Sequence, residues 1–433
     1  MVDVAEIKIW GELVGAVRWD DNQKLGFFEY DRRFLDSGWE LSPLKMPLSQ
    51  GNRIYSFPEL RKGRNETEDT FKGLPGMLAD VLPDRYGNKL INIWLAQRGR
   101  PEESMNPVEK LCFIGARGMG ALEFEPTQIA SGKRTFELEM NSLIEVAQKM
   151  LNEREFFLAE LKGDEKKAML DILKIGTSAG GARPKAVIAY NPKTGQVRSG
   201  QGNVPKGFEH WLLKLDGVSG EQFGESHGWG RVEYAYYLMA KKCDIQINES
   251  QLLEENGRAH FMTRRFDREG NTKHHIQSLC GMQHYDFNDM QGYSYEQVFQ
   301  TMRSLRLSYP EAEEMFRRMT FNVIATNYDD HTKNFSFILE KDQPWKLAPA
   351  YDLCFSYDPQ NHWVDRQTLS VNGKRENITE ADLLTIANDN NIKRGKKIIH
   401  EVNETVKNWK SFAKEAKVRD DLVERIQTNL NTL

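Results

Sequence analysis

Residues 6–30 alternate apolar and polar side chains with a period of two, a pattern typical of β-strands. Two turn signals, Gly11-Glu12 and Asp20-Asp21-Asn22, divide this segment into three runs. The pattern therefore predicts three short strands at the start of the chain.

The next periodic segments predict one helix and a fourth strand. The helix is expected from about Pro83 to Gln97, because glycine and proline follow it and end helical structure. The glycine-rich segment 115–120 then precedes a short strand at 121–124. Residues 125–133 contain Pro, Thr, Ser and Gly, which marks a domain boundary.

The rest of the chain divides into a strand-rich unit, residues 165–265, and a mainly helical unit, residues 270–433. Strands are predicted at 186–190, 210–215 and 261–266, and helices at 141–151 and 231–242. From Tyr295 onward apolar residues recur mainly at helical spacing. These units predict an α+β protein with the two-lobed layout of a kinase, in which a nucleotide would bind between the lobes.

Length and composition agree with a globular protein of two or three domains. The chain has 433 residues, is 39% hydrophobic and carries a net charge of −4, which argues against a protein that coats nucleic acid by itself. Its 4 cysteines are scattered without a C-x-x-C pair, as expected for reduced thiols. The sequence shows no signal-peptide pattern and no apolar stretch long enough to span a membrane, so we expect a cytoplasmic protein.

The candidate chemistry is concentrated between residues 325 and 352. Asp329 is followed after four residues by Asn334, which is the spacing of a kinase catalytic loop. In such a loop the aspartate accepts the proton of the attacking hydroxyl and the asparagine binds Mg²⁺. A predicted hairpin then returns Asp352 toward the metal, and oxygen ligands of this kind suit Mg²⁺. The alternative is a polar loop and hairpin whose acids are only solvated.

Two further features are consistent with phosphate binding. The loop from Gly176 to Lys185 has small residues where a phosphate-cradling turn needs close backbone approach, although it lacks the Lys-Ser/Thr of a Walker A motif. Lys214 lies among apolar neighbours and calls for an acidic partner, for which Glu233 on the next helix is the candidate. An ordinary hairpin loop and a solvent-facing lysine are the alternatives.

His331 lies between Asp329 and Asn334 and raises the alternative of a metal phosphohydrolase site of the His/Asp type. The other histidines form no ligand pattern apart from the adjacent His274-His275. We therefore expect His331 to have a structural or supporting role.

Four motifs occur in order along the chain and are jointly specific. They are T-S-A-G-G-A-R-P-K (177–185), H-W-L-L-K-L (210–215), R-R-F-D-R (264–268), and N-Y-D-D-H-T-K-N-F-S-F (327–337) with L-A-P-A-Y-D (347–352). Together they resemble the HipA family, the serine/threonine kinase toxins of bacterial type II toxin–antitoxin systems. The resemblance implies a HipA variant of the protein-kinase fold. Its expected parts are an N-terminal β-rich subdomain (1–130), a kinase N-lobe with the phosphate-binding loop (131–265) and a helical C-lobe with the catalytic and metal-binding loops (266–433).

The resemblance also implies roles for individual residues. Asp329 is expected to be the catalytic base, and Asn334 and Asp352 the Mg²⁺ ligands. Ser178 matches the family's autophosphorylated serine, with Thr177 as the rival acceptor. The residues implied to bind ATP are Ala179, Gly180, Gly181, Ala182, Arg183, Lys185, Lys214, Arg264, Phe266, Asp267, His331 and Lys333.

Within that set, Arg264 to Phe266 would hold the adenine edge through backbone groups, and Asp267 would lie near the ribose. Two positions depart from the family's pattern. Arg264 stands where the family's hinge often has an acid, and Arg183-Pro184-Lys185 stands where its loop often has Gln-Glu-Lys.

The function implied by the resemblance is that of an ATP- and Mg²⁺-dependent serine/threonine protein kinase. Such a toxin inhibits growth by phosphorylating a translation component, typically an aminoacyl-tRNA synthetase, and inactivates itself by autophosphorylation, here on Ser178. Its implied partners are a HipB-like helix-turn-helix antitoxin and, mainly through that antitoxin, operator DNA.

Two other functions stay open. A small-molecule phosphotransferase of the aminoglycoside-kinase type shares the Asp-x-x-x-x-Asn spacing and a later aspartate. A degenerate kinase that only binds its antitoxin as a corepressor is the third candidate. The intact set of Asp329, Asn334 and Asp352 argues against that last function.

Overall fold

The computed structural model describes residues 2–61, 69–96, 98–102, 104–127, 184–216 and 227–433. The chain divides into two compact units. Unit 1 contains residues 1–41, 46–227 and 253–275, and unit 2 contains residues 42–45, 228–252 and 276–433. The expected helix at 141–151 lies outside the described residues.

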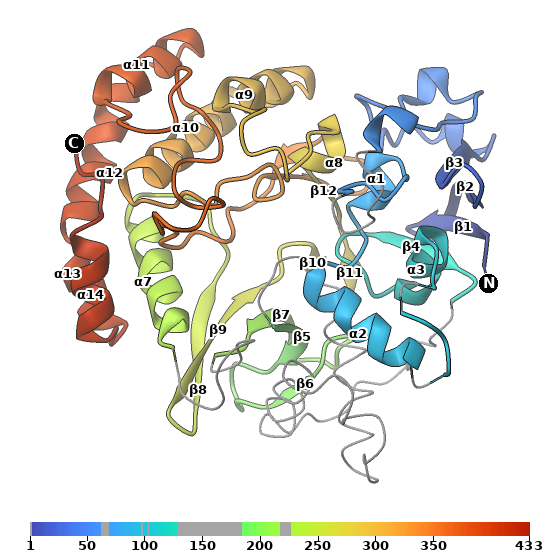
Figure 1. Ribbon diagram of the computed structural model, residues 1–433, viewed down its shortest axis with the longest axis horizontal. Helices are drawn as coiled ribbons and strands as arrows, with labels where there is room; N and C mark the ends of the chain where they lie inside the picture. The colour runs from blue at the N-terminus through green and yellow to red at the C-terminus, as the bar shows by residue number, and fades with distance from the viewer. Residues whose placement is uncertain (1, 62–68, 97, 103, 128–183, 217–226) are drawn as a thin grey trace. The chain divides into compact units, whose positions relative to one another are not determined.

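Unit 1 begins with a four-stranded antiparallel sheet in the order β3-β2-β1-β4. Its strands are β1 (Val4–Ile9), β2 (Glu12–Asp20), β3 (Leu25–Tyr30) and β4 (Leu122–Glu125). The described residues of this part also form three 3₁₀ helices, η1 (Phe34–Asp36), η2 (Leu48–Gln50) and η3 (Pro58–Leu60), and three α-helices, α1 (Gly76–Ala79), α2 (Arg85–Ala96) and α3 (Pro107–Ile114). Helix α3 packs on the sheet and is buried along its whole length, so it forms the core of this part (Figure 1).

A five-stranded sheet follows in the order β6-β5-β7-β9-β8. Its strands are β5 (Lys185–Tyr190), β6 (Val197–Ser199), β7 (Glu209–Lys214), β8 (Ser250–Glu255) and β9 (Arg258–Arg264). Two short strands, β10 (Arg268–Glu269) and β11 (Thr272–Lys273), pair directly after β9. Strand β5 is buried at five successive positions, which explains its nearly continuous apolar sequence.

Unit 2 is mainly helical. Its helices are α7 (Trp229–Lys242), α8 (Leu279–Gln283), α9 (Tyr295–Ser304), α10 (Tyr309–Ile324), α11 (Glu380–Asp389), α12 (Gly395–Lys407), α13 (Trp409–Glu415) and α14 (Asp420–Gln427). A small sheet in the order β12-β13-β14 is formed by β12 (His275–Ser278), β13 (Ser336–Leu339) and β14 (Lys346–Leu347). Among the described helices, none combines the length and apolar character needed to cross a membrane.

Helix α10 forms the centre of unit 2 and leads to the candidate site. A capping box between Ser308 and Glu311 fixes its start, and every residue from Glu314 to Ile324 is buried. At its C-terminal end, the Tyr236 hydroxyl on α7 donates a 2.6 Å hydrogen bond to the Ala325 carbonyl. Because α7 also packs against α13, the residue that follows α10 is held from within the core (Figure 1).

The structure confirms the predicted early strands, the central strands and the helices within the described ranges. The predicted strand at 261–266 is shifted, since β9 starts at Arg258 and ends at Arg264. It starts there because Asn256 and Gly257 form a turn with positive φ angles of 45° and 78°. All 4 cysteines are buried, and burial raises the pKa of Cys112 to about 12 and that of Cys243 to about 11.

Candidate active site

The loop between α10 and β13, residues 325–335, brings Asp329 and Asn334 together. The Asn334 side-chain amide donates to the Asp329 backbone carbonyl, and its backbone N–H donates to the His331 carbonyl at 2.9 Å. These bonds close the loop on itself, so the five-residue spacing between the aspartate and the asparagine follows from local geometry. The Asp329 side chain is 48% exposed and is therefore accessible to a substrate hydroxyl.

His331 lies beside Asp329 within this loop. Its Nδ1 accepts a hydrogen bond from the Lys333 N–H at 3.2 Å, and its Nε2 lies 3.6 Å from Asp329 Oδ1. Burial lowers the pKa of His331 although Asp329 acts in the opposite direction. A neutral imidazole with its proton on Nε2 therefore faces the carboxylate, which agrees with a supporting role. Lys333 Nζ lies 4.6 Å from the ring centroid of Phe287.

Asp330 points into the protein and anchors the same loop. Its Oδ2 accepts hydrogen bonds from the Tyr295 hydroxyl at 2.7 Å and from Gln367 Nε2 at 2.6 Å. Its Oδ1 accepts from the backbone N–H groups of Thr368 and Leu369 at 2.8 and 3.2 Å. Burial raises the pKa of this carboxyl group to about 6, and the four hydrogen bonds oppose that shift.

The donors around Asp330 belong to a longer chain of hydrogen bonds. Asn327 donates to Asn322 at 2.9 Å, and Asn322 donates to the Tyr295 hydroxyl at 3.0 Å. Sequence reasoning missed this network, because Tyr295, Asn322 and Gln367 are far apart in the chain. The only local signal was the Asp329-Asp330 doublet, in which one acid is half exposed and the other buried.

A hairpin returns the chain to this loop, as predicted. Strands β13 and β14 pair, and the Ala350 N–H donates to the Gln246 carbonyl at 2.7 Å. The Tyr351 hydroxyl then donates to the Lys333 carbonyl at 2.7 Å, which ties the end of the hairpin to the loop. Asp352 follows with a positive φ of 53°, a conformation that turns its side chain out of the extended path.

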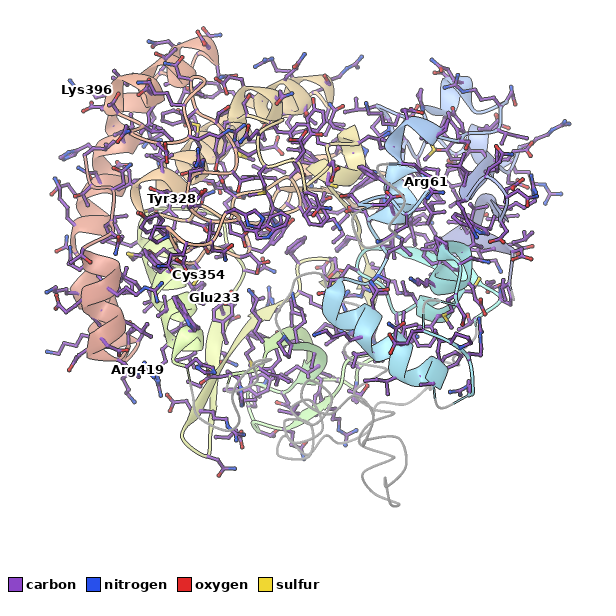
Figure 2. The ribbon with its side chains drawn as sticks, in the orientation of Figure 1. Arg61, Glu233, Tyr328, Cys354, Lys396 and Arg419 are labelled. Atoms are coloured by element: carbon purple, nitrogen blue, oxygen red, sulfur yellow. The ribbon has the colours of Figure 1, made fainter. Side chains whose placement is uncertain are left out.

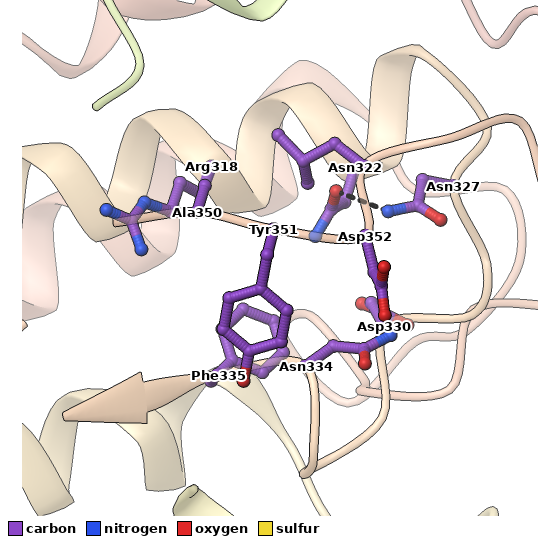
Figure 3. Close-up of a pocket in the computed structure, with 10 residues that line it drawn as sticks. Arg318, Asn322, Asn327, Asp330, Asn334, Phe335, Ala350, Tyr351 and Asp352 are labelled. Atoms are coloured by element: carbon purple, nitrogen blue, oxygen red, sulfur yellow. Dashed lines mark hydrogen bonds between the residues drawn. The ribbon is translucent and has the colours of Figure 1, made fainter. Parts of the chain in front are cut away.

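Asn334 and Asp352 line the same pocket in unit 2, together with Asn322, Asn327 and Asp330 (Figure 3). No group of three or more His, Cys, Asp or Glu side chains forms a metal site within the described ranges. Mg²⁺ needs fewer protein ligands, since it keeps several waters and takes phosphate oxygens. The Asn334 side-chain nitrogen donates a hydrogen bond to Asp329. The side-chain oxygen of Asn334 is therefore available as a metal ligand, together with the Asp352 carboxylate in the same pocket. This pair of oxygen ligands fits Mg²⁺.

The predicted phosphate-binding residues belong to unit 1. Lys214, the last residue of β7, is directly opposite Lys185 on β5, so both side chains leave the same face of the sheet. Lys185 is 3% exposed and its Nζ lies 4.0 Å from Asp84 Oδ2. The loop residues Ala179, Gly180, Gly181, Ala182 and Arg183, and the expected acceptors Ser178 and Thr177, lie outside the described residues. Two lysines paired in this way suit a polyanionic ligand.

Glu233 lies on α7 in unit 2 and is buried (Figure 2). Lys214 lies in unit 1, so the ion pair between them stays a prediction. The structure does place Glu233 on a helix at the predicted position, since α7 contains residues 231–242.

The R-R-F-D-R motif forms the end of β9 and the turn after it. Arg264 is 47% exposed, and its Nη1 lies 3.5 Å from Glu209 Oε1. The Arg265 N–H donates to the His210 carbonyl at 2.9 Å, which continues the pairing with β7 by one residue. Asp267 is fully buried between Arg265 and Arg268. The assignments of Arg264 and Phe266 to adenine and of Asp267 to ribose stay predictions.

A helix that ends in an Asp-x-x-x-x-Asn loop, with a hairpin that returns a second aspartate beside it, defines a protein of the kinase-like class. Two family models match the sequence. Residues 5–125 match the HipA N-terminal domain, and residues 177–410 match the HipA-like C-terminal domain. The second match alone covers more than half of the chain, and the chain therefore belongs to the HipA family.

Comparison with solved structures agrees with this family. The fold is similar to that of HipA from Shewanella oneidensis MR-1, solved in complex with HipB and its operator DNA, with a TM-score of 0.68 and 17% sequence identity. The similarity covers 99% of this chain and 96% of that chain. The predicted α+β, kinase-like HipA fold is thereby confirmed.

A more limited similarity links the chain to a protein of Haemophilus influenzae described as “Putative kinase”. The two are 29% identical over 134 residues, which is 28% of this chain. The matched part spans 39% of the length of that relative.

Proposed function

We propose that this chain is an ATP-dependent serine/threonine protein kinase that acts as the toxin of a HipA/HipB-type toxin–antitoxin system in the cytoplasm. The observation that carries the proposal is the convergence of Asp329, Asn334 and Asp352 in one part of unit 2, in a chain of the HipA family. A half-exposed carboxylate, in the same loop as one of two oxygen ligands that suit Mg²⁺, supports phosphoryl transfer to a hydroxyl.

In this mechanism Asp329 orients the substrate hydroxyl and accepts its proton as the oxygen attacks the γ-phosphorus. Neutral His331 lies beside this carboxylate, with its Nε2 3.6 Å from Asp329 Oδ1. Asn334 and Asp352 would hold Mg²⁺, which neutralises charge on the phosphate oxygens when bound. Asp330, on the buried side of the loop, holds the loop in place through its hydrogen bonds with Tyr295 and Thr368.

Nucleotide binding is proposed to use the residues at the ends of β5, β7 and β9. Lys185 and Lys214 would contact phosphates, and the backbone of residues 179–183 would cradle them as an anion nest. Arg264 to Phe266 would hold the adenine edge through backbone groups. The paired register of Lys185 and Lys214 supports this assignment, because their two positive charges leave the same face of the sheet.

The partners and the self-regulation are proposed from family membership. The solved relative from Shewanella is bound to HipB and operator DNA. We therefore expect a HipB-like antitoxin to bind this chain and to link it to DNA. The expected substrate is a translation component of the aminoacyl-tRNA synthetase class. Autophosphorylation on Ser178, or on its neighbour Thr177, would add about −1.5 to −2 charges to the phosphate-binding loop and so oppose ATP binding.

The test is a phosphoproteomic comparison of cells that express this chain with cells that express Asp329→Asn. We expect growth arrest and new phosphoserine or phosphothreonine sites only with the unsubstituted chain. Phosphorylation of small-molecule alcohols without new phosphoprotein sites would favour the aminoglycoside-kinase type of function instead. Binding of an antitoxin with no phosphoryl transfer at all would favour a corepressor.

A further inference from the structure

The carboxylate of Asp267 is completely enclosed in unit 1. Its exposed fraction is 0%, and its two oxygens accept four hydrogen bonds. Arg265 donates from Nε to Oδ1 at 2.8 Å and from Nη2 to Oδ2 at 2.6 Å. Arg268 Nη1 donates to Oδ2 at 2.7 Å, and the Gly120 backbone N–H donates to the same oxygen at 2.8 Å.

Gly120 is 147 residues from Asp267 and belongs to the part of the chain that matches the HipA N-terminal domain. The two arginines also bind this part. Arg268 donates to the carbonyls of Gly118 and Gly120 at 3.1 and 2.9 Å, and Arg265 donates to the Gly118 carbonyl at 3.4 Å. We call Asp267, Arg265, Arg268 and the loop 116–120 the Asp267 clamp. The clamp joins residues of both family domains.

A lysine extends the clamp along the β10–β11 hairpin. Lys273 Nζ donates to the Ala116 carbonyl at 2.7 Å and to Glu123 Oε1 at 2.6 Å. The Trp10 indole N–H donates to the Lys273 carbonyl at 2.8 Å, so the turn directly after β1 and strand β4 both have residues in contact with this hairpin. Each of these bonds crosses between residues 10–123 and residues 265–273.

The clamp combines charged side chains with one glycine that has a positive φ angle. Burial raises the pKa of Asp267, but the charges of Arg265 and Arg268 outweigh it and hold the pKa well below its ordinary value. Burial lowers the pKa of Arg268 to about 10, so this arginine is charged at neutral pH. Gly120 has a φ of 78°, which a side chain would strain, and its N–H and its carbonyl both bond to the clamp.

We propose that Asp267 is a positioning residue that fastens the N-terminal domain to the segment that follows β9, and that it is not a ligand of the nucleotide ribose. The carboxylate has an exposed fraction of 0% and both oxygens accept from buried arginines, so a ribose hydroxyl could reach it only if these charged partners moved away. Arg265 belongs both to the clamp and to the Arg264–Phe266 segment, so the N-terminal domain supports that segment directly. The consequence for nucleotide affinity rests on the proposed function, whereas the clamp itself does not.

A neighbouring contact is consistent with this role. Asp84, also in the N-terminal domain, has its Oδ2 4.0 Å from Lys185 Nζ on β5. The N-terminal domain therefore meets the strand-rich part of unit 1 at two places, one beside the expected phosphate lysines and one beside the expected adenine segment. The N-terminal domain therefore packs directly against the strands that carry the expected nucleotide-binding residues.

The clamp is tested by hydrogen exchange on the full chain. Asp267→Asn and Arg268→Met should each raise the exchange rate of amides in residues 116–122 by roughly tenfold or more, because each breaks charged, buried hydrogen bonds. The double variant should add little to the single ones, since both remove the same interaction. Asp21→Asn, which breaks an exposed pair with Lys24, is the matched control and should change nothing in these amides. Unchanged exchange in 116–122 with both clamp variants would overturn the proposal.

Nucleotide analogues separate positioning from ribose binding. We would measure dissociation constants for Mg·ADP, Mg·2′-deoxy-ADP and Mg·3′-deoxy-ADP with the unsubstituted chain, Asp267→Ala and Arg268→Met. The proposal expects each variant to raise the dissociation constants of all three nucleotides by the same factor. The ratio of the dissociation constant of ADP to that of each deoxy form should then stay constant. Loss of that ratio in Asp267→Ala but not in Arg268→Met would show a ribose ligand and refute the proposal. If no form binds ADP, the proposed kinase function fails and the exchange experiment still decides the clamp.

Discussion

Asp330 in unit 2 and Asp267 in unit 1 are both almost completely buried carboxyl groups with four hydrogen bonds, yet their pKa values move in opposite directions. The donors to Asp330 are neutral: a phenol, an amide and two backbone N–H groups. The donors to Asp267 include two guanidinium groups. Neutral donors lower the pKa of a buried carboxyl group by less than burial raises it. Two charged arginines lower the pKa by more than burial raises it. The type of donor therefore decides how each acid responds to pH.

The largest effect is expected at the exposed neighbour of Asp330. Asp329→Asn should lower the rate of phosphoryl transfer by roughly two to four decades, because it removes the general base. Its side chain is 48% exposed, so stability should hardly change. The measurement is single-turnover transfer with saturating Mg·ATP, next to thermal unfolding.

Asp352→Ala is the matched variant for that experiment. It should weaken Mg·ATP binding itself, whereas Asp329→Asn should leave most of that affinity intact. Wild-type transfer rates in a folded Asp329→Asn sample would show that another group is the base.

The second effect concerns stability in unit 1. Asp267→Asn should lower the free energy of unfolding by about 3–5 kcal/mol, because it leaves buried arginine charges without their carboxylate. Since the folded pKa of Asp267 is depressed, its contribution is complete above about pH 4 and is lost only as pH falls below that value. The difference between the variant and the unsubstituted chain, measured by urea denaturation, should therefore be constant from pH 5 to 8.

The third effect is a pH dependence of stability at Asp330, whose pKa is raised whereas that of Asp267 is lowered. Asp330 has a folded pKa of about 6, above its unfolded value, so the folded state binds more protons between about pH 4 and 6. Its contribution to stability is complete below pH 4 and is lost as pH rises through 6, by about 3 kcal/mol in total. Asp330→Asn cannot titrate, so it should be more destabilising at pH 5 than at pH 8. An equal effect at both values would contradict the raised pKa.

The smallest effect is expected from one donor of the Asp330 network. Tyr295→Phe keeps the buried ring and removes the hydroxyl that donates to Asp330 at 2.7 Å. We expect a loss of about 1–3 kcal/mol in stability, since two hydrogen bonds to this hydroxyl disappear. The apparent pKa of Asp330, read from the pH dependence of unfolding, should rise further. Tyr309→Phe, at an exposed hydroxyl that donates to Glu313, is the control.

Sequence reasoning predicted the parts of the candidate site whose arrangement is set by local geometry. The spacing from Asp329 to Asn334 is set by hydrogen bonds inside one loop, and the hairpin to Asp352 is set by its own alternating pattern. Apolar periodicity likewise predicted the strands and α10, because each buries a face defined by its own residues.

The partners of Asp330 and Asp267 could not be predicted in the same way. Gln367 is 37 residues from Asp330, and Gly120 is 147 residues from Asp267, so no spacing in the sequence links them. The R-R-F-D-R motif and the glycine segment 115–120 were each visible as motifs. That one contacts the other depends on the packing of the β10–β11 hairpin, which apolar periodicity does not specify.

The buried cysteines make the protein suitable for site-specific labelling. A thiol reacts as the thiolate, and both the burial of all 4 cysteines and the raised pKa values of Cys112 and Cys243 disfavour that form. A single cysteine introduced at an exposed position of each unit, for example at Glu59 and Lys396, should therefore react with maleimide dyes before any native thiol does. Energy transfer between two such dyes would report whether Mg·ATP changes the distance between the units, without removing any native cysteine.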